Sequence, residues 1–289
     1  MRQIKIEGFS ENIIDDLRPA VCVFGAENSG TTRFGMTLPH SEGYIGCLAV
    51  DGNSKITIEE FKDKWKLPLL VNSKPFITHA EAIGLASNED PEKVKKVYSD
   101  VMKRVTDQTM LLVANPNIES ILVDRISQIW DYILFSHFGR KNQIDSMTQR
   151  PLANQDMIDF INALRAKNLV LACKASEVYQ PTGEVDKMGR KKSEGTGKFK
   201  PDGFSKIGQF VTATIELTTS KKKLVSGDED EEGDQESKDQ AKLAQKFKAR
   251  IQACKKKPLL ENVDLSLKPY RIAGDRITWD NIMTLLGIE

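Results

Sequence analysis

Short apolar runs that alternate with longer amphipathic stretches constrain the fold more than any other feature of this chain. Four runs are continuously apolar over a few residues, which is typical of strands buried on both faces of a parallel sheet. They span residues 20–24, 45–50, 120–123 and 169–173, and a fifth candidate strand spans 209–217. Apolar residues recur at helical spacing over residues 90–107, 125–138, 152–166 and 277–286. This alternation predicts an α/β fold with a mostly parallel sheet flanked by helices.

The first expected strand runs into a glycine-bearing segment, GAENSGTT. Its glycines and its last threonine have the spacing of a phosphate-binding loop, in which backbone N–H groups converge on phosphate oxygens at a helix N-terminus. The final Ser or Thr of such a loop binds Mg²⁺, so Thr32 is the expected metal ligand. The sequence therefore predicts a nucleotide phosphate site lined by Gly25, Asn28, Ser29, Gly30, Thr31 and Thr32.

Polar residues stand at the ends of the other expected strands. Asp51, Asp124 and Lys174 each directly follow an apolar run. The carboxyl ends of strands in an α/β sheet meet at the edge where ligands bind, so we expect these side chains near the loop. Asp124 ends the segment SILVD, which has the form of a Walker B strand whose acid orders Mg²⁺.

These motifs together resemble RecA-like P-loop ATPases. The resemblance rests on the phosphate loop, an acid-ended strand, the segments ILVDRISQIWD, FGR and LVLACKASEVY, and a Gly/Lys-rich loop, and it covers residues 18–218. More narrowly, the chain is similar to the ATP-binding proteins that many bacteriophages carry for DNA recombination and single-strand annealing. The resemblance implies a RecA-like core, ATP and Mg²⁺ as cofactors, single-stranded DNA and recombination or replication proteins as partners, and a place in the host cytoplasm. Such relatives often form rings or filaments.

The chain departs from the family pattern at two charged positions. Thr31 stands where the phosphate loop has its lysine, and Asn53 stands where the family has a glutamate that orients water. The resemblance therefore implies that Asp51 or Asn53 positions the attacking water. An amide can position water but cannot accept a proton. One explanation is that Lys174, Arg125 or Arg33 supplies the missing positive charge to a working ATPase. The other is a degenerate pseudo-ATPase that serves as a DNA- or protein-binding scaffold; a small-molecule kinase has less support, because no acceptor-binding motif is visible.

A basic, glycine-rich stretch at 181–206 follows the fourth expected strand and reads as a low-complexity loop. The resemblance implies that it meets single-stranded DNA, with Tyr179, Phe199 or Phe204 stacking on bases. The expected phosphate contacts are Lys187, Arg190, Lys191, Lys192, Lys198 and Lys200. The alternative is a solvated insertion whose lysines have no ligand.

Charge is also segregated near the C-terminus. Residues 226–240 form a low-complexity acidic run, and the basic segment 241–257 follows it. Leu243, Phe247 and Ile251 lie four residues apart, which predicts an amphipathic helix with a basic face. That face could bind nucleic acid or an acidic partner, or the whole region could be a solubilising linker before a surface helix.

Composition limits the remaining possibilities. The net charge is +1, so the whole-chain balance favours no class of partner. The 4 cysteines form no CxxC pair, which indicates free thiols in a reducing cytosol. No apolar run is long enough to span a membrane, so we expect no membrane partner. We expect a RecA-like core at 1–220, an acidic linker at 221–240, and a charged C-terminal extension at 241–289.

Overall fold

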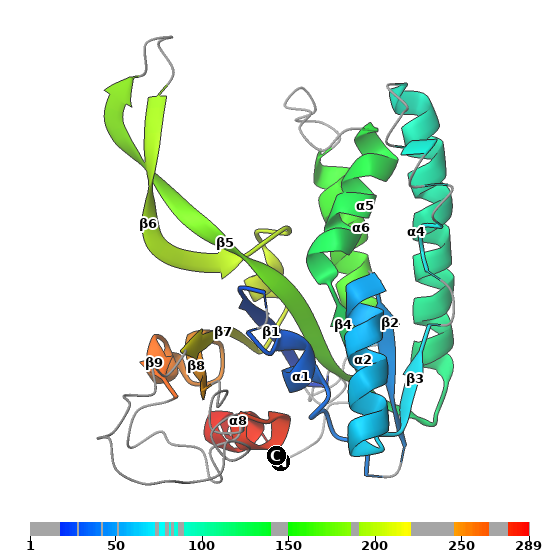
Figure 1. The fold of residues 1–289 in the computed structure, drawn as a ribbon, viewed down its shortest axis with the longest axis vertical. Coiled ribbons are helices and arrows are strands. Elements are labelled where there is room, and N and C mark those ends of the chain that lie inside the picture. The colour runs from blue at the N-terminus through cyan, green and yellow to red at the C-terminus, as the bar shows by residue number, and fades with distance from the viewer. Residues whose placement is uncertain are drawn as a thin grey trace, which may run out of the picture.

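The computed structural model describes residues 18–27, 29–41, 43–50, 52–72, 75–78, 81, 84–85, 90–139, 150–185, 191–220, 246–265 and 277–288. These residues form a nine-stranded, mostly parallel mixed sheet with six helices against its faces (Figure 1). The parallel strands are β1 (Ala20–Gly25), β2 (Tyr44–Ala49), β3 (Leu69–Val71), β4 (Ile118–Asp124), the first part of β5 (Asn168–Val185) and β7 (Ala213–Ser220). The antiparallel strands are β6 (Lys191–Pro201), β8 (Lys246–Cys254) and β9 (Val263–Asp264). The strand order is β3-β2-β4-β5-β1-β7-β8-β9, and β6 pairs with β5 outside this row. The predicted α/β class is confirmed.

The helices divide between the two faces of the sheet, and each face has its own apolar core. One core contains α4 (Pro91–Ala114), α5 (Ile126–Phe138) and α6 (Arg150–Leu164), and the other contains α1 (Thr31–Gly35), α2 (Gly52–Trp65) and α8 (Trp279–Leu286). Strand β1 contributes Cys22 and Phe24 to the first core and Val21 and Val23 to the second. Because both faces are covered, the central strands have continuous apolar runs rather than apolar residues at alternate positions only.

Most expected elements have observed counterparts. The four continuously apolar runs correspond to β1, β2, β4 and the start of β5, and the four helical patterns correspond to α4, α5, α6 and α8. The fifth strand was predicted too early, because a 3₁₀ turn at Ile207–Gln209 precedes β7, which begins only at Ala213. Strand β3 was missed because it is only 3 residues long.

The basic stretch at 181–206 is largely a β-hairpin, so the prediction of a low-complexity loop was wrong. β5 continues beyond the sheet and pairs antiparallel with β6, from Ala175 opposite Pro201 to Val185 opposite Lys191. The two strands project from the body as an arm, which we define as residues 175–185 and 191–201 (Figure 1). The sequence hid these strands because glycine and lysine are depleted in strands generally and give no apolar alternation. Backbone pairing therefore holds a segment that has little core of its own.

The basic segment at 241–257 was predicted as a helix, and this was also wrong. Residues 246–254 form β8, which pairs antiparallel with β7 and extends the sheet. Ala249 and Ile251 are buried, whereas Arg250 between them is exposed. A repeat of four residues is also twice the strand repeat of two, so the spacing of apolar residues here fits either element.

No helix within the described ranges is long and apolar enough to cross a membrane. The acidic run at 226–240 lies outside the described residues, as do residues 1–17.

Candidate phosphate-binding site

The glycine-bearing loop begins in the middle of the sheet, at the carboxyl ends of the parallel strands. Gly25, the last residue of β1, pairs with Lys174 of β5 on one side and with Leu217 of β7 on the other. β4 lies on the far side of β5, where Asp124 is level with Ala172. The strand order therefore brings the loop, Lys174 and Asp124 to one edge of the sheet.

A short hydrogen bond joins the end of the loop to the acid of β4. Thr32 Oγ1 donates to Asp124 Oδ2 at 2.6 Å, although the two residues are 92 positions apart in the chain. Asp124 is only 2% exposed, whereas Thr32 is half-buried in α1. Hydrogen bonds to an ionised acceptor are the shorter and stronger kind. The contact holds the start of α1 against the end of β4.

The loop between β1 and α1 is closely packed at its base. A Cβ on Gly25 would lie 2.2 Å from Ser29 Oγ and 2.3 Å from the backbone oxygen of Leu217, so only glycine fits there. Gly30 has a φ of +91°, which favours glycine at the turn into α1. Ser29 is 2% exposed, and its Oγ makes no hydrogen bond within the described part of the chain. A buried hydroxyl without a partner is uncommon, and it leaves the loop with a free polar group.

The candidate replacements for the loop lysine lie in different places. Lys174 Nζ is 3.8 Å from the Glu27 Oε1 of the loop, so its side chain reaches over the loop. The Arg33 guanidinium instead lies over the Trp65 ring, 5.3 Å from the ring centroid, on the α2 side. Arg125 is half-buried and precedes the first residue of α5. The ion pair with Glu27 therefore places Lys174 at the loop.

Three of the expected site residues cannot be placed by their side chains. Asp51 and Asn28 lie outside the described residues. Asn53 is described only as backbone within α2. The expectation that Asp51 or Asn53 positions water stays a prediction.

The donor set fits a magnesium ion that is held mainly by a nucleotide. No cluster of three or more His, Cys, Asp or Glu side chains with metal-binding geometry occurs in the described ranges. Mg²⁺ in phosphoryl-transfer sites usually takes one or two protein carboxylates, and phosphates and water complete its shell. Thr32 and Asp124 could supply a hydroxyl and a carboxylate to such an ion.

The expected nucleic-acid contacts lie on the arm. Lys187 and Arg190 fall outside the described residues, and Lys191 is described only as the first residue of β6. The other three, Lys192, Lys198 and Lys200, are exposed on β6. Lys192 Nζ donates to Glu184 Oε2 at 3.0 Å across the hairpin, and both side chains are exposed.

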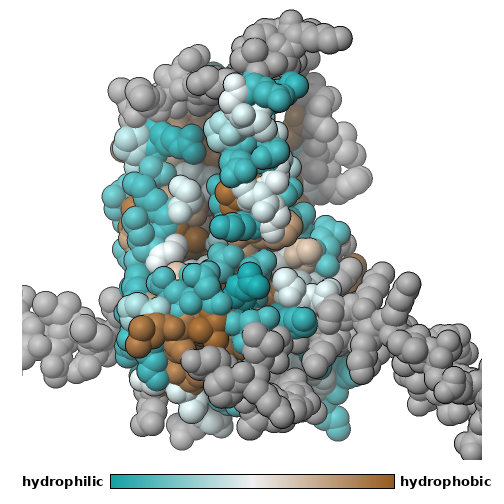
Figure 2. Space-filling view, turned by 90° about the vertical axis from the view of Figure 1, so that its left-hand side faces the viewer, coloured by the Kyte–Doolittle hydropathy of each residue, from teal (hydrophilic) through white to brown (hydrophobic). Residues whose placement is uncertain are grey.

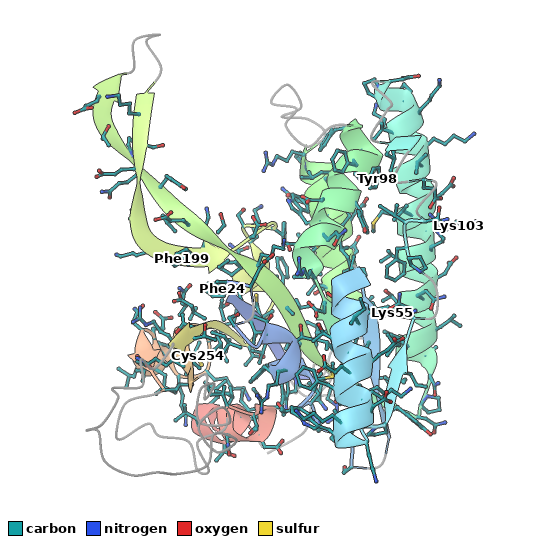
Figure 3. The ribbon with its side chains drawn as sticks, in the orientation of Figure 1. Phe24, Lys55, Tyr98, Lys103, Phe199 and Cys254 are labelled. Atoms are coloured by element: carbon teal, nitrogen blue, oxygen red, sulfur yellow. The ribbon has the colours of Figure 1, made fainter. Side chains whose placement is uncertain are left out.

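Two of the three expected stacking residues are exposed on the arm. Tyr179 is 62% exposed and Phe199 is 40% exposed, and Figure 3 shows Phe199 near the base of the arm. Phe199 is opposite Glu177, and Tyr179 follows Glu177 by two residues, beyond a shift in the register of the hairpin. Both rings therefore lie within one short length of the arm. Seen from the side on which the arm projects, the surface is mainly hydrophilic apart from a compact apolar patch in its lower half (Figure 2).

Phe204 was wrongly predicted to stack on bases. It is 2% exposed, and its ring centroid lies 5.1 Å from that of Trp130 on α5. The ring belongs to the apolar core beneath the arm and cannot reach a ligand without local unfolding.

Sequence reasoning overlooked Glu27 but correctly described the thiols as free, and all 4 are buried. Glu27 is a carboxylate inside a phosphate loop, and its charge alone could have drawn attention to it. Burial, reinforced by the charge of Asp124, raises the pKa of Cys47 to about 12. Burial and the neighbouring Cys22 thiol, 3.5 Å away, raise the pKa of Cys173 well above its usual value. Neither Cys47 nor Cys173 is a nucleophile at neutral pH.

Comparison with known proteins matches the chain to no family model and to no curated protein. The function therefore has to be argued from the geometry of the site.

Proposed function

We propose that the protein has a RecA-like P-loop core, binds ATP with Mg²⁺ at the loop from Gly25 to Thr32, and acts on single-stranded DNA in recombination, repair or replication. The 2.6 Å hydrogen bond between Thr32 Oγ1 and Asp124 Oδ2 carries the proposal. A P-loop site uses a loop hydroxyl and a strand-end carboxylate around its Mg²⁺, and these are the two groups that meet here. A chance match to the glycine pattern would give no reason for a buried acid on another strand to bond to the last threonine of the loop.

Lys174 is the residue that we assign to the charge of the missing loop lysine. Its backbone is level with Gly25, and its ammonium group already contacts the loop at Glu27. Both partners of this ion pair are exposed, and exposed pairs contribute only about 0–1 kcal/mol. A phosphate group could therefore take the place of Glu27 beside Lys174 at little cost.

A pseudo-ATPase scaffold is the second candidate, and Glu27 is the observation that favours it. A carboxylate within the loop repels phosphate, and Thr31 brings no compensating charge. Under this reading the arm would bind DNA or protein while nucleotide binding would be weak or absent.

The two candidates differ in their response to ATP and to single-stranded DNA. We would measure ATP binding and hydrolysis with and without oligothymidylate, for the wild type, Asp124→Ala and Lys174→Met. Asp107→Ala is the matched control, because Asp107 is an exposed acid on α4. An ATPase predicts DNA-stimulated turnover that Asp124→Ala abolishes and Lys174→Met weakens. DNA binding by a wild type with no measurable nucleotide affinity would reject the ATPase and support the scaffold.

The arm provides the DNA part of the proposal. Two exposed aromatic side chains on one short length of a hairpin suit base stacking, which contributes about 1–3 kcal/mol per base. Tyr179→Ala with Phe199→Ala should therefore weaken binding of single-stranded DNA by a factor of ten or more, as about 1.4 kcal/mol is tenfold. Unchanged DNA affinity in this exposed double variant would remove the arm from the DNA site.

A further inference from the structure

A second group of cations gathers at the opposite edge of the sheet from the phosphate loop. The Arg18 N–H donates to the Arg165 backbone oxygen at 3.1 Å, just before β1 and β5 begin. The Lys255 N–H donates to the backbone oxygen of Thr212 at 3.1 Å, just after β8 ends and before β7 begins. Thr212 in turn pairs with the first residue of β1, Ala20. Arg18, Arg165 and Lys255 therefore lie on adjoining segments; we call these three residues the amino-edge cluster.

The charges of the amino-edge cluster have no acidic partner within the described part of the chain. No ion pair there joins a carboxylate to any of the three residues. Arg165 Nε is buried and makes no hydrogen bond among those residues. Glu261 lines a hollow together with Lys255 and Thr212.

Two of these cations are close enough to disfavour each other. Burial lowers the pKa of Arg165. Burial, and then the positive charge of Arg165, lower the pKa of Lys255. Like charges in a partly buried setting destabilise the charged forms unless a counter-charge is present. An anion between the two side chains would relieve this repulsion.

Local structure explains Arg165 and Lys255 separately, but it does not explain why the two cations lie together. Arg165 directly follows the last residue of α6, where the helix dipole favours a cation. Lys255 Nζ donates to the backbone oxygen of Gln209, in the 3₁₀ turn. Neither role requires two unpaired cations side by side, and a neutral donor would serve at Lys255.

We propose that the amino-edge cluster is a phosphate-binding site, separate from the ATP loop, which takes the backbone of a nucleic acid. A guanidinium group matches phosphate with paired donors, and an ammonium group adds a point charge. Lys256 directly follows Lys255, and the backbone oxygen of Lys206 accepts from the N–H of Gln209, the residue that Lys255 Nζ contacts. Both lysines are exposed and add to the basic surface, which favours a polymer over a free phosphate compound. The site needs no ATP. It rests on the DNA part of the proposed function, and it adds a contact on the side of the sheet away from the loop.

The test uses a double variant that combines Arg165→Gln with Lys255→Gln, which we call the cluster variant. It is compared with a control double variant that loses the same amount of charge elsewhere. Lys96→Gln with Lys103→Gln is suitable, because both lysines are exposed on α4, and Figure 3 shows Lys103 on its outer side. We would measure oligothymidylate affinity against salt concentration, melting with magnesium-free pyrophosphate, and MgATP binding. Each lost phosphate contact should flatten the slope of log K against log salt by about 0.7. The slope should therefore be about 1.4 flatter for the cluster variant and unchanged for the control. Both variants should keep MgATP binding.

The other outcomes separate the sources of phosphate and the two proposals. If the cluster variant keeps the salt slope but loses a pyrophosphate-induced rise in melting temperature that the control retains, the site takes free phosphate compounds and the nucleic-acid assignment is overturned. If both properties match the control, the cluster binds no phosphate. Failure of the wild type to bind MgATP would reject the proposed ATPase and leave this site untouched. Without ligand the cluster variant should melt no lower than the control, since it has lost a repulsion; a large loss of stability would show that the cations are structural.

Discussion

Replacing Thr32 by valine tests the contact on which the nucleotide site depends. Valine keeps the branched shape of threonine but removes the hydroxyl that donates to Asp124 at 2.6 Å. A hydrogen bond to a charged group contributes about 1.5–3 kcal/mol. Thr32 is only half-buried, so a water molecule can restore part of the hydrogen bonding that the lost hydroxyl provided. We therefore expect a loss in the lower half of that range, about 1.5–2 kcal/mol.

Thermal and urea denaturation measure this loss. A destabilisation of 1 kcal/mol lowers the melting temperature of a domain of this size by about 2–4 °C, so Thr32→Val should melt about 3–8 °C below the wild type. Thr106→Val is the control, because Thr106 is exposed on α4 and the same substitution there removes no contact with Asp124. If Thr32→Val is no less stable than this control, the bond to Asp124 does not form in solution.

The same variant also reports on the metal. A ligand present at a hundred times its Kd stabilises the folded state by about 2.7 kcal/mol. The wild type should show such a rise with MgATP, and Thr32→Val should lose the part that depends on Mg²⁺. A magnesium-dependent rise of equal size in both proteins would show that Thr32 does not hold the ion.

Three further results follow from packing. Gly25→Ala should lower stability by about 1–3 kcal/mol or more in urea denaturation, because its Cβ would meet the Leu217 backbone 2.3 Å away; a neutral effect would contradict the close packing of the loop. Phe204→Ala should cost about 3–5 kcal/mol, because the ring packs on Trp130, whereas loss of DNA binding at unchanged stability would restore it as a stacking residue. Cys47, whose pKa is about 12, should resist maleimide at pH 8 until the protein is denatured, and labelling of the native protein would show that the strand opens.

The core of the fold could be predicted from the sequence because its strands are buried on both faces. A run such as AVCVF has no polar position, so it can only be an interior element, and the loop that follows it is identified by its glycines. The meeting of Thr32 with Asp124 was also within reach, since strand ends of an α/β sheet share one edge. What the sequence could not provide was distance: nothing in the chain indicates that Lys174 reaches Glu27 while Arg33 lies over Trp65.

The errors fell on segments whose structure depends on backbone pairing. The arm has glycines and lysines in place of an apolar repeat, so its strands look like solvated chain until β5 and β6 are seen together. In β8 the four-residue spacing between Phe247 and Ile251 fits a helix and a strand equally well, and only the exposed edge of β7 decided between them. Whether a segment finds a strand to pair with depends on the whole fold, so the local sequence pattern cannot predict it.

The antiparallel pairing of β7 with β8 makes the chain suitable for division into two pieces. Ser220 and Lys246 are cross-strand neighbours, so the ends of the intervening segment are already held together by the sheet. A cut within that segment would place β7 and β8 on different fragments. The hydrogen-bonded pairing between the two strands would be kept. Two fragments expressed from separate genes should therefore reassemble through β7 and β8. The protein could in this way serve as a split reporter whose recovery depends on one strand pair.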